Sequence, residues 1–372
     1  MNLSGPCRIS GGFGTGKTTL LRARAEAVAD AGLRPLVLHH RDLVGFSVEL
    51  LRRHGRPSVE LLDDADRAGL VAELLDASPS DLDVGADELA GAVLAYEGSF
   101  LGVEELRVHA DAAGQLSRWE FLASFTDRYL GVLAGRDRVD RAGAVVQASL
   151  ALRDPAVLAA ERARFDHLLV DDYQLATFAT ARLVAQLAGV GGNVTVAGNP
   201  EAAIGSDFSS GAVFFERFAA RFGGATEIAL DSPHRSPAAP TLRLADGPDD
   251  ERGAILEALG RGPDLGLSDA DAVVFSSAAG VGDDSVGREW ALVVVAGVGK
   301  GRWPRPRPAE GVFDLHLLGG PDVPHAAERD RQWFELERRR FAVATSRATQ
   351  WLVLVAEPPV SPFVGDLVRA SA

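Results

Sequence analysis

Eight residues near the start of the chain constrain its fold more than any other feature. Gly11, four further residues and the triplet Gly16-Lys17-Thr18 follow a short β-rich segment, Cys7 to Ser10. A good helix-forming sequence begins directly afterwards at Thr19. Strand, glycine-rich loop and helix in this order are typical of a loop that cradles phosphate groups with its backbone N–H groups. A glycine-rich turn without a ligand is the alternative, but it explains neither flank.

Each position of this loop has an expected role toward a nucleoside triphosphate. Lys17 would neutralise the β- and γ-phosphate oxygens, and the Thr18 hydroxyl would ligate Mg²⁺. The N-terminus of the following helix adds its partial positive charge. The residues expected to hold the nucleotide phosphates are Gly11, Gly12, Gly14, Thr15, Gly16, Lys17, Thr18 and Thr19.

The lysine content of the chain supports this interpretation. Only Lys17 and Lys300 occur, and arginine supplies nearly all the remaining positive charge. Chance is therefore a poor explanation for an ammonium at the position that a phosphate loop requires. A dinucleotide-binding fold also clusters glycines, but it has no use for Lys17 and Thr18. It also needs an acidic residue at the end of the second strand, where this sequence reads His39-His40-Arg41.

Composition and charge exclude several classes of protein. With 47% hydrophobic and 24% charged residues, the chain is expected to be globular rather than disordered. No apolar run approaches the ~20 residues that span a bilayer, and the start lacks a basic stretch followed by an apolar one. We therefore expect a cytoplasmic protein without a membrane partner. The formal net charge of −14 means that nucleic-acid binding would need a local basic track.

The alternation of short β-rich runs with helical stretches predicts an α/β protein with parallel sheets. A chain of 372 residues suits two domains. We expect a first lobe at 1–222 and a second at 223–372, with a boundary at Phe222-Gly223-Gly224, and a loop at 232–240. Leucine and alanine at helical spacing between about 58 and 164 predict an all-helical insertion in the first lobe.

A second candidate site element follows an apolar segment, His167 to Val170, which reads as a strand. Asp171 and Asp172 come directly after it. In a parallel sheet the carboxyl end of such a strand faces the phosphate loop. Asp171 would then hold Mg²⁺ directly or through water, and Asp172 would polarise the attacking water. Two aspartates in a surface turn are the structural alternative.

From these residues onwards the chain resembles the UvrD/Rep-type DNA helicases of superfamily 1A. Their second motif, Asp-Glu-x-Gln, is similar to Asp171-Asp172-Tyr173-Gln174, which adds Gln174 to the catalytic residues. Leu230 to Ser236 looks like the family's Tyr-Arg-Ser segment. The resemblance puts Arg235 in the place of the arginine that contacts the γ-phosphate.

The resemblance continues near the end of the chain. Gly287-Arg288-Glu289-Trp290 looks like the family's Gly-Leu-Glu-Trp box, with Glu289 at the ribose-contacting glutamate. Glu337 to Ala348 is similar to the last motif, which places Arg347 as the second γ-phosphate arginine. With the nearby Gly301-Arg302-Trp303-Pro304, the closest similarity is to motor subunits of actinobacterial helicase-nucleases.

The resemblance implies a fold and an activity. The fold would be two RecA-like P-loop lobes, and the cofactors would be ATP and Mg²⁺. The activity would be ATP hydrolysis coupled to single-stranded DNA binding or translocation in DNA repair or recombination. Two guanidinium groups on the γ-phosphate, from Arg235 and Arg347, would make closure of the cleft depend on ATP.

Several family motifs are missing or altered. No Asn-x-x-Gln precedes the loop, so adenine selectivity is not implied. Ala202 stands where the third motif, Gly-Asp-x-x-Gln, ends in glutamine, and two aspartates occur within 281–286 where the family has a cationic segment that grips DNA. Phe208 fits either a base-stacking aromatic or a core residue. The stretch from Arg235 to Gly287 is too short for the family's large accessory subdomain, which predicts a compact, partly degenerate member.

Two other functions stay open on the sequence. A degenerate helicase could act as a nucleotide-gated module that closes on ATP to present a surface to a protein partner, without unwinding DNA. A small-molecule kinase would transfer phosphate to an acceptor, but it leaves Arg235, Glu289 and Arg347 without an ordered explanation. We therefore expect ATP as the ligand, with single-stranded DNA or a protein as the macromolecular partner.

Overall fold

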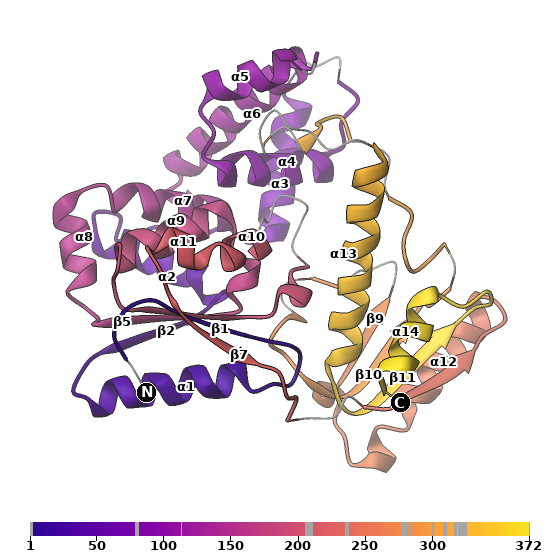
Figure 1. Ribbon diagram of the computed structural model, residues 1–372. Coiled ribbons are helices and arrows are strands. Elements are labelled where there is room, and N and C mark those ends of the chain that lie inside the picture. Colours follow the sequence, from indigo (N-terminus) through magenta and orange to yellow (C-terminus); the bar gives the residue numbers. More distant parts are fainter. Residues whose placement is uncertain are drawn as a thin grey trace.

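The structure, a computed structural model, describes residues 3–78, 82–112, 114–204, 211–234, 238–276, 281–282, 285–299, 301–307, 311–315, 318 and 326–371. Two parallel sheets form its framework, and a group of helices lies beyond one end of them (Figure 1). This mixed α/β architecture is consistent with the RecA-like fold that the sequence predicts.

The first sheet is five-stranded and parallel. Its central strands β5 and β6 are buried along their whole length because helices cover both faces of the sheet. In spatial order the strands are β2 (Pro35–His39), β5 (His167–Asp171), β6 (Val194–Gly198), β1 (Cys7–Gly11) and β7 (Thr226–Leu230).

Helix α1 covers one face of the first sheet, and α2, α7 and α9 cover the other (Figure 1). Leu169 packs with α1, whereas Leu168 and Val170 pack with α7 and α9, as alternation along a strand requires. The helices around this sheet are α1 (Lys17–Asp30), α2 (Asp42–Arg53), α7 (Arg141–Ala151), α8 (Pro155–Arg162), α9 (Phe178–Ala188), α10 (Gly211–Glu216) and α11 (Phe218–Arg221), with the short 3₁₀ helices η1 (Tyr173–Leu175) and η2 (Pro200–Ala202).

The second sheet is four-stranded and also parallel. Helices α13 and α14 pack on one face and α12 on the other. In spatial order its strands are β8 (Pro240–Leu244), β11 (Ala348–Ala356), β10 (Trp290–Ala296) and β9 (Ala272–Ser276). Its helices are α12 (Pro248–Gly260), α13 (Ala326–Ser346) and α14 (Pro362–Ser371), with the 3₁₀ helices η3 (Pro263–Leu265) and η4 (Asp269–Asp271).

The passage between the sheets differs from the sequence prediction. β7 pairs with β1, from Cys7↔Thr226 to Gly11↔Leu230, and so belongs to the first sheet. The Phe222-Gly223-Gly224 turn reads as a boundary between lobes, but it leads from α11 into this edge strand, so the expected place of β7 is wrong. The sequence analysis also does not predict β8. This strand begins with a proline, which reads as a loop residue, although strands tolerate proline at their first position or on an edge.

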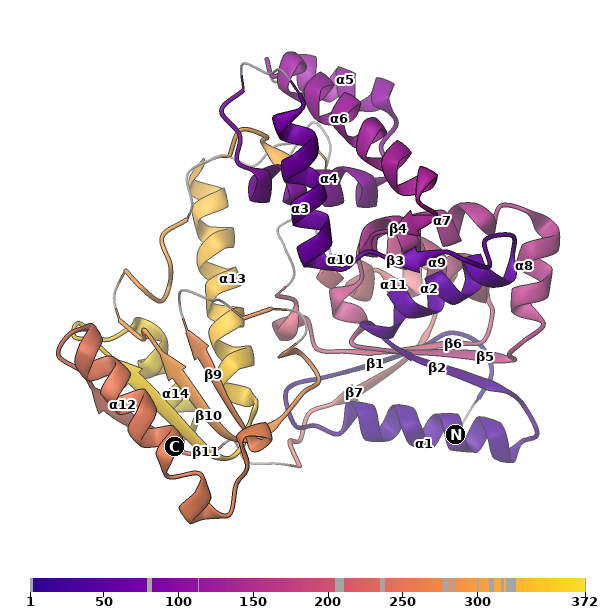
Figure 2. The same ribbon diagram turned by 180° about the vertical axis from the view of Figure 1, so that it is seen from behind.

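The predicted helical insertion at 58–164 has two parts in the structure. One part, α7 and α8, packs around the first sheet. The other is a helical unit with a core of its own, formed by α3 (Asp64–Asp76), α4 (Ala86–Ser99), α5 (Val103–Ala112) and α6 (Leu116–Gly135). Figures 1 and 2 both show this helical unit beside the outer end of α13. The insertion is not all-helical, because β3 (Glu60–Leu61) and β4 (Arg138–Val139) pair in parallel where the chain enters and leaves the unit. Within the described residues, no helix has the length and apolar character required to cross a membrane.

A segment between β10 and α13 completes the core of the helical unit. Phe313 is only 4% exposed and packs edge-on against Trp119, with ring centroids 6.3 Å apart, and parallel to Phe121 at 6.5 Å. The backbone N–H of Val312 donates a hydrogen bond to the Glu88 carboxylate. The helical unit is therefore tied to the part of the chain that carries the second sheet.

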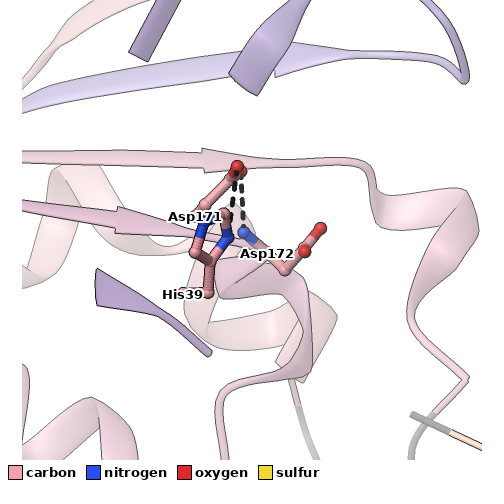
Figure 3. A group of neighbouring side chains, drawn as sticks. All are labelled: His39, Asp171 and Asp172. Atoms are coloured by element: carbon pink, nitrogen blue, oxygen red, sulfur yellow. Dashed lines mark hydrogen bonds and ion pairs between the residues drawn. The ribbon is translucent and has the colours of Figure 1, made fainter. Parts of the chain in front are cut away.

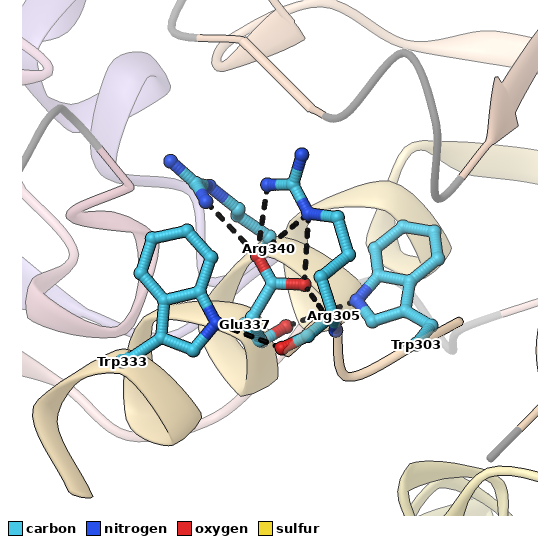
Figure 4. Close-up of polar contacts among 5 residues, drawn as sticks. All are labelled: Trp303, Arg305, Trp333, Glu337 and Arg340. Atoms are coloured by element: carbon cyan, nitrogen blue, oxygen red, sulfur yellow. Dashed lines mark hydrogen bonds and ion pairs between the residues drawn. The ribbon is translucent and has the colours of Figure 1, made fainter. Parts of the chain in front are cut away.

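The chain between β10 and α13 is also hydrogen-bonded to α13 itself (Figure 4). Glu337 is buried and accepts hydrogen bonds from the guanidinium groups of Arg305 and Arg340, at 2.9 Å each. The indole N–H of Trp303 donates to the Glu337 backbone oxygen at 3.2 Å, and that of Trp333 donates to the Arg305 oxygen at 2.8 Å. Burial raises the pKa of Glu337, but the hydrogen bonds from Arg305 and Arg340 outweigh it and leave that pKa below its ordinary value.

Phe313→Ala should destabilise the helical unit by about 3–5 kcal/mol, because truncation of a buried phenylalanine loses apolar contacts and leaves a cavity. Urea unfolding and hydrogen exchange of α6 peptides measure the effect. Val190→Ala is the control, since Val190 is 88% exposed and its truncation should change stability by no more than about 0.5 kcal/mol. Unchanged protection of α6 in Phe313→Ala would show that the packing is incidental.

Candidate active site

A cleft of about 740 Å³ lies between the two sheets. The glycine-rich loop after β1 and the start of α1 form one wall, and residues around the start of β10 and the end of α13 form the other. The residues that line it are Phe13, Gly14, Thr15, Gly16, Lys17, Thr18, Thr19, Leu20, Ala23, Asp172, Gln174, Asn199, Ala202, Leu230, His234, Val286, Gly287, Glu289 and Arg347.

The glycines of the loop are required by its backbone. A Cβ on Gly11 would lie 2.5 Å from the Thr15 hydroxyl oxygen and 2.8 Å from the Leu230 backbone oxygen. Gly14 and Gly16 have φ values of 71° and 84°, which side chains other than glycine rarely adopt. The Thr15 hydroxyl donates to the Gly12 oxygen at 3.0 Å and closes the turn. The loop therefore leads directly into α1, which begins at Lys17. The N–H groups in the first turn of that helix have no intrahelical partners.

Lys17 carries a positive charge that the cleft destabilises. Burial, with a smaller contribution from Arg347, lowers its pKa to about 8, although the Asp172 and Asp171 carboxylates act in the opposite direction. Its ammonium donates to the Gly12 backbone oxygen at 2.5 Å. A polyanion in the cleft would offset the cost of burying this charge.

The acidic pair meets the loop at the end of β5. The Thr18 hydroxyl donates to Asp171 Oδ2 at 2.7 Å, and Asp171 Oδ1 accepts the Asp172 backbone N–H at 2.9 Å. Asp171 is only 2% exposed. Both of its oxygens are thus engaged, as a buried carboxylate requires.

Asp172 faces the cleft through an uncommon backbone conformation. Its φ of 54° is in the left-handed region and turns the chain sharply into η1. The Gln174 amide donates to Asp172 Oδ1 at 3.3 Å and accepts the Asn199 backbone N–H at 3.0 Å. Burial, with a further contribution from Asp171, raises the pKa of Asp172 above its ordinary value.

His39 is a member of this site that the sequence does not assign to it. The register of β2 and β5 places His39 opposite Asp171, and its Nδ1 lies 3.7 Å from Asp171 Oδ2. Within the part of the chain that the structure describes, the ligand atoms of His39, Asp171 and Asp172 all lie within 4.8 Å of one another (Figure 3). The only signal is its place at the end of a strand, because the sequence does not say which strands are neighbours.

The opposite wall brings the second-sheet residues to the same cleft. A Cβ on Gly287 would lie 2.7 Å from Asp172 Oδ2, so the backbone there passes directly against that carboxylate. The Arg347 guanidinium stacks over the Phe13 ring, 5.3 Å from its centroid, and donates to the Arg288 backbone oxygen at 3.3 Å. Glu289 lines the same wall.

The floor of the cleft is an apolar core that both parts of the chain share. Leu175, Ala202 and Ile204, which follow strands of the first sheet, are buried in the core of the second sheet, and Phe13 packs against it. Arg338 on α13 also forms an ion pair with Glu201 at 3.1 Å. Ala202, where the resembling family has glutamine, is therefore a packing residue here.

Most residues predicted for the site meet in this cleft. Gly14, Thr15, Gly16, Lys17, Thr18, Thr19, Asp172, Gln174, Glu289 and Arg347 line it, Gly11 and Gly12 begin its loop, and Asp171 binds Thr18. Arg235 and Phe208 lie outside the described residues. Besides His39, the sequence does not assign Phe13, Asn199 and His234, although the His234 N–H donates to the Gly14 oxygen at 2.9 Å.

Residues 42–206 match the family model of the UvrD/REP helicase N-terminal domain. This match supports a UvrD-like helicase family, and with it an ATP-binding, DNA-binding enzyme of the helicase type. The matched stretch contains Asp171, Asp172 and Gln174, and it begins after the phosphate loop. No curated protein matches the chain.

Lys17→Met removes the buried ammonium and keeps an unbranched side chain that is one heavy atom shorter. The pKa of Lys17 in the fold, about 8, lies below the ordinary 10.5, so folding disfavours the charged form. This cost is fully present below about pH 8 and disappears as the pH rises toward about 10.5. The variant should therefore melt at a higher temperature than the parent at pH 7, and the difference should shrink toward pH 10.5. Arg22→Met, at an exposed position of α1, is the control for thermal unfolding; a difference independent of pH would contradict the prediction.

Proposed function

We propose that this chain is a compact, partly degenerate UvrD-like ATPase. It binds ATP with Mg²⁺ in the cleft and couples hydrolysis to single-stranded DNA binding or translocation, in DNA repair or recombination. The observation that carries the proposal is that Lys17 and Asp172 face Glu289 and Arg347 across one cleft. A small-molecule kinase would not require this second wall of charged groups.

In this proposal the two sheets are the cores of two RecA-like lobes. The first lobe extends through β7 and carries the helical unit as an insertion, and the second begins with β8. The absence of a large accessory subdomain between Arg235 and Gly287 makes the member compact. The binding of a nucleotide between the lobes would then depend on the distance between them.

The residues fit Mg²⁺ by the chemistry of their donors. Thr18 and Asp171 offer a hydroxyl and a carboxylate oxygen, the hard ligands that Mg²⁺ prefers. When bound, Mg²⁺ would neutralise charge on the β- and γ-phosphates. Lys17 would neutralise the same oxygens from the loop, and the first turn of α1 would donate its N–H groups.

Asp172, Gln174 and the arginines have roles in the chemical step. Asp172 would orient the attacking water and accept its proton, and its raised pKa makes it a better base than an ordinary aspartate. Gln174 would hold Asp172 in position through their hydrogen bond. Arg347, with Arg235 as the proposed second arginine, would stabilise the charge that develops on the γ-phosphate.

A second candidate function is a nucleotide-gated protein-interaction module without unwinding. The observation that favours it is Ala202, whose burial in the shared core leaves the position without a γ-phosphate-sensing side chain. The net charge of −14 also gives DNA little general attraction. Such a module would close on ATP with little turnover.

Lys17→Ala should abolish ATP turnover, because no other lysine is near the loop in sequence.

Arg347→Ala should leave ATP affinity within about threefold while kcat falls at least about 10²-fold, since its charge acts on the transition state. Phosphate release and the binding of a fluorescent ATP analogue measure the two quantities. Arg331→Ala, at an exposed position of α13, is the matched control for Arg347. Full activity in Lys17→Ala would refute the assigned site.

The rate of ATP hydrolysis with and without single-stranded DNA separates the two candidate functions. A translocating motor should be stimulated several-fold, because DNA binding favours the closed, active arrangement of its lobes. The Lys17→Ala protein gives the background for each condition. An unstimulated rate in a protein that still binds ATP would favour the interaction module.

A further inference from the structure

The placement of His39 bears on the choice of metal ion. Two atoms bound to one ion at ~2.1 Å lie at most about 4.2 Å apart. His39 Nδ1 and Asp171 Oδ2 are 3.7 Å apart, within that limit, and the Thr18 hydroxyl is 2.7 Å from the same carboxylate oxygen. A ring nitrogen and a hydroxyl therefore converge on the oxygen that would hold a cation.

The backbone holds His39 in this place. Its N–H is bonded to the Asp42 carboxylate at 3.2 Å, and the next N–H, of His40, donates to the Asp171 backbone oxygen at 3.0 Å. The parallel pairing of β2 with β5 supports the same register. The sheet thus fixes the backbone of His39 opposite that of Asp171, and from there the imidazole Nδ1 lies 3.7 Å from Asp171 Oδ2.

The chemistry of an imidazole differs from that of the other donors. Carboxylate, hydroxyl and water oxygens suit Mg²⁺, whereas a neutral imidazole nitrogen is a ligand for first-row transition metals. Adding one nitrogen to an oxygen site raises its affinity for a transition metal relative to Mg²⁺. The Asp172 carboxylate lies beside this pair, with the ligand atoms of His39, Asp171 and Asp172 within 4.8 Å of one another (Figure 3).

We propose that His39 is a ligand of the divalent cation at Asp171 and gives this site a preference for Mn²⁺ over Mg²⁺. The inference rests on the proposed function in one respect: the cation is the one that accompanies the nucleotide. It adds a nitrogen ligand from β2 to the oxygen ligands Thr18 and Asp171.

The test is pulsed electron paramagnetic resonance of Mn²⁺ bound to the full chain, with the methylene analogue of ATP, which has no nitrogen in its phosphate chain. The spectrum should show coupling to a directly bound ¹⁴N, and selective ¹⁵N-histidine labelling should convert it into ¹⁵N coupling. His39→Ala should lose this coupling, and its preference for Mn²⁺ over Mg²⁺ in competition titrations should fall about tenfold. His109→Ala, which removes a histidine of α5 in the helical unit, should keep both properties.

Bound Mn²⁺ without nitrogen coupling in the parent protein would overturn the inference, whatever the variants do. Absence of Mn²⁺ binding would overturn it as well. Binding of a fluorescent ATP analogue in the same samples distinguishes this failure from that of the proposed function: intact nucleotide binding leaves the ATP site standing, and its loss refutes both. His39→Asn, which keeps a polar side chain at the strand end, repeats the measurement if His39→Ala is unstable.

Discussion

The hydrogen bond from the Thr18 hydroxyl to the Asp171 carboxylate, 2.7 Å long, is the contact on which the site depends. It joins the first turn of α1 to the end of β5, although β6 lies between β5 and β1 in the sheet. Asp171 is buried, and a buried carboxylate is stable only when its oxygens are paired. The same pairing positions Asp172, whose N–H bonds the other Asp171 oxygen.

The second wall of the cleft is held against the first mainly by apolar contact. The Arg338–Glu201 ion pair joins the two parts, but its side chains are 39% and 53% exposed, and pairs in contact with solvent contribute only about 0–1 kcal/mol. The shared core around Ala202 and Ile204 removes apolar surface from water and therefore stabilises the contact more than the ion pair does. Above this floor, Arg347 stacks on Phe13, so the phosphate loop and the end of α13 are in direct contact. Separation of the sheets would break this contact.

Several residues were predictable because their signals are local. The phosphate loop is defined by spacing and by its two flanks, and β5 by an apolar run that ends in two aspartates. Other features depend on contacts between distant segments. β7 has the length and composition of a strand for either sheet, and only its pairing with β1 assigns it to the first. Phe313 looks like an ordinary loop residue, yet it fills the core of a helical unit whose helices are far from it in sequence.

Local chemistry could be inferred from the residues alone: a glycine loop that ends in Lys17 and Thr18, and carboxylates at the end of a strand. These patterns are readable because a backbone turn or a strand end is specified by a few consecutive residues. In contrast, the fold as a whole brings His39 beside Asp171, Gly287 against Asp172 and Phe13 against Arg347. Strand order and the packing of one sheet on the other set these distances, and they depend on the total buried surface of the fold, which no short stretch of sequence encodes.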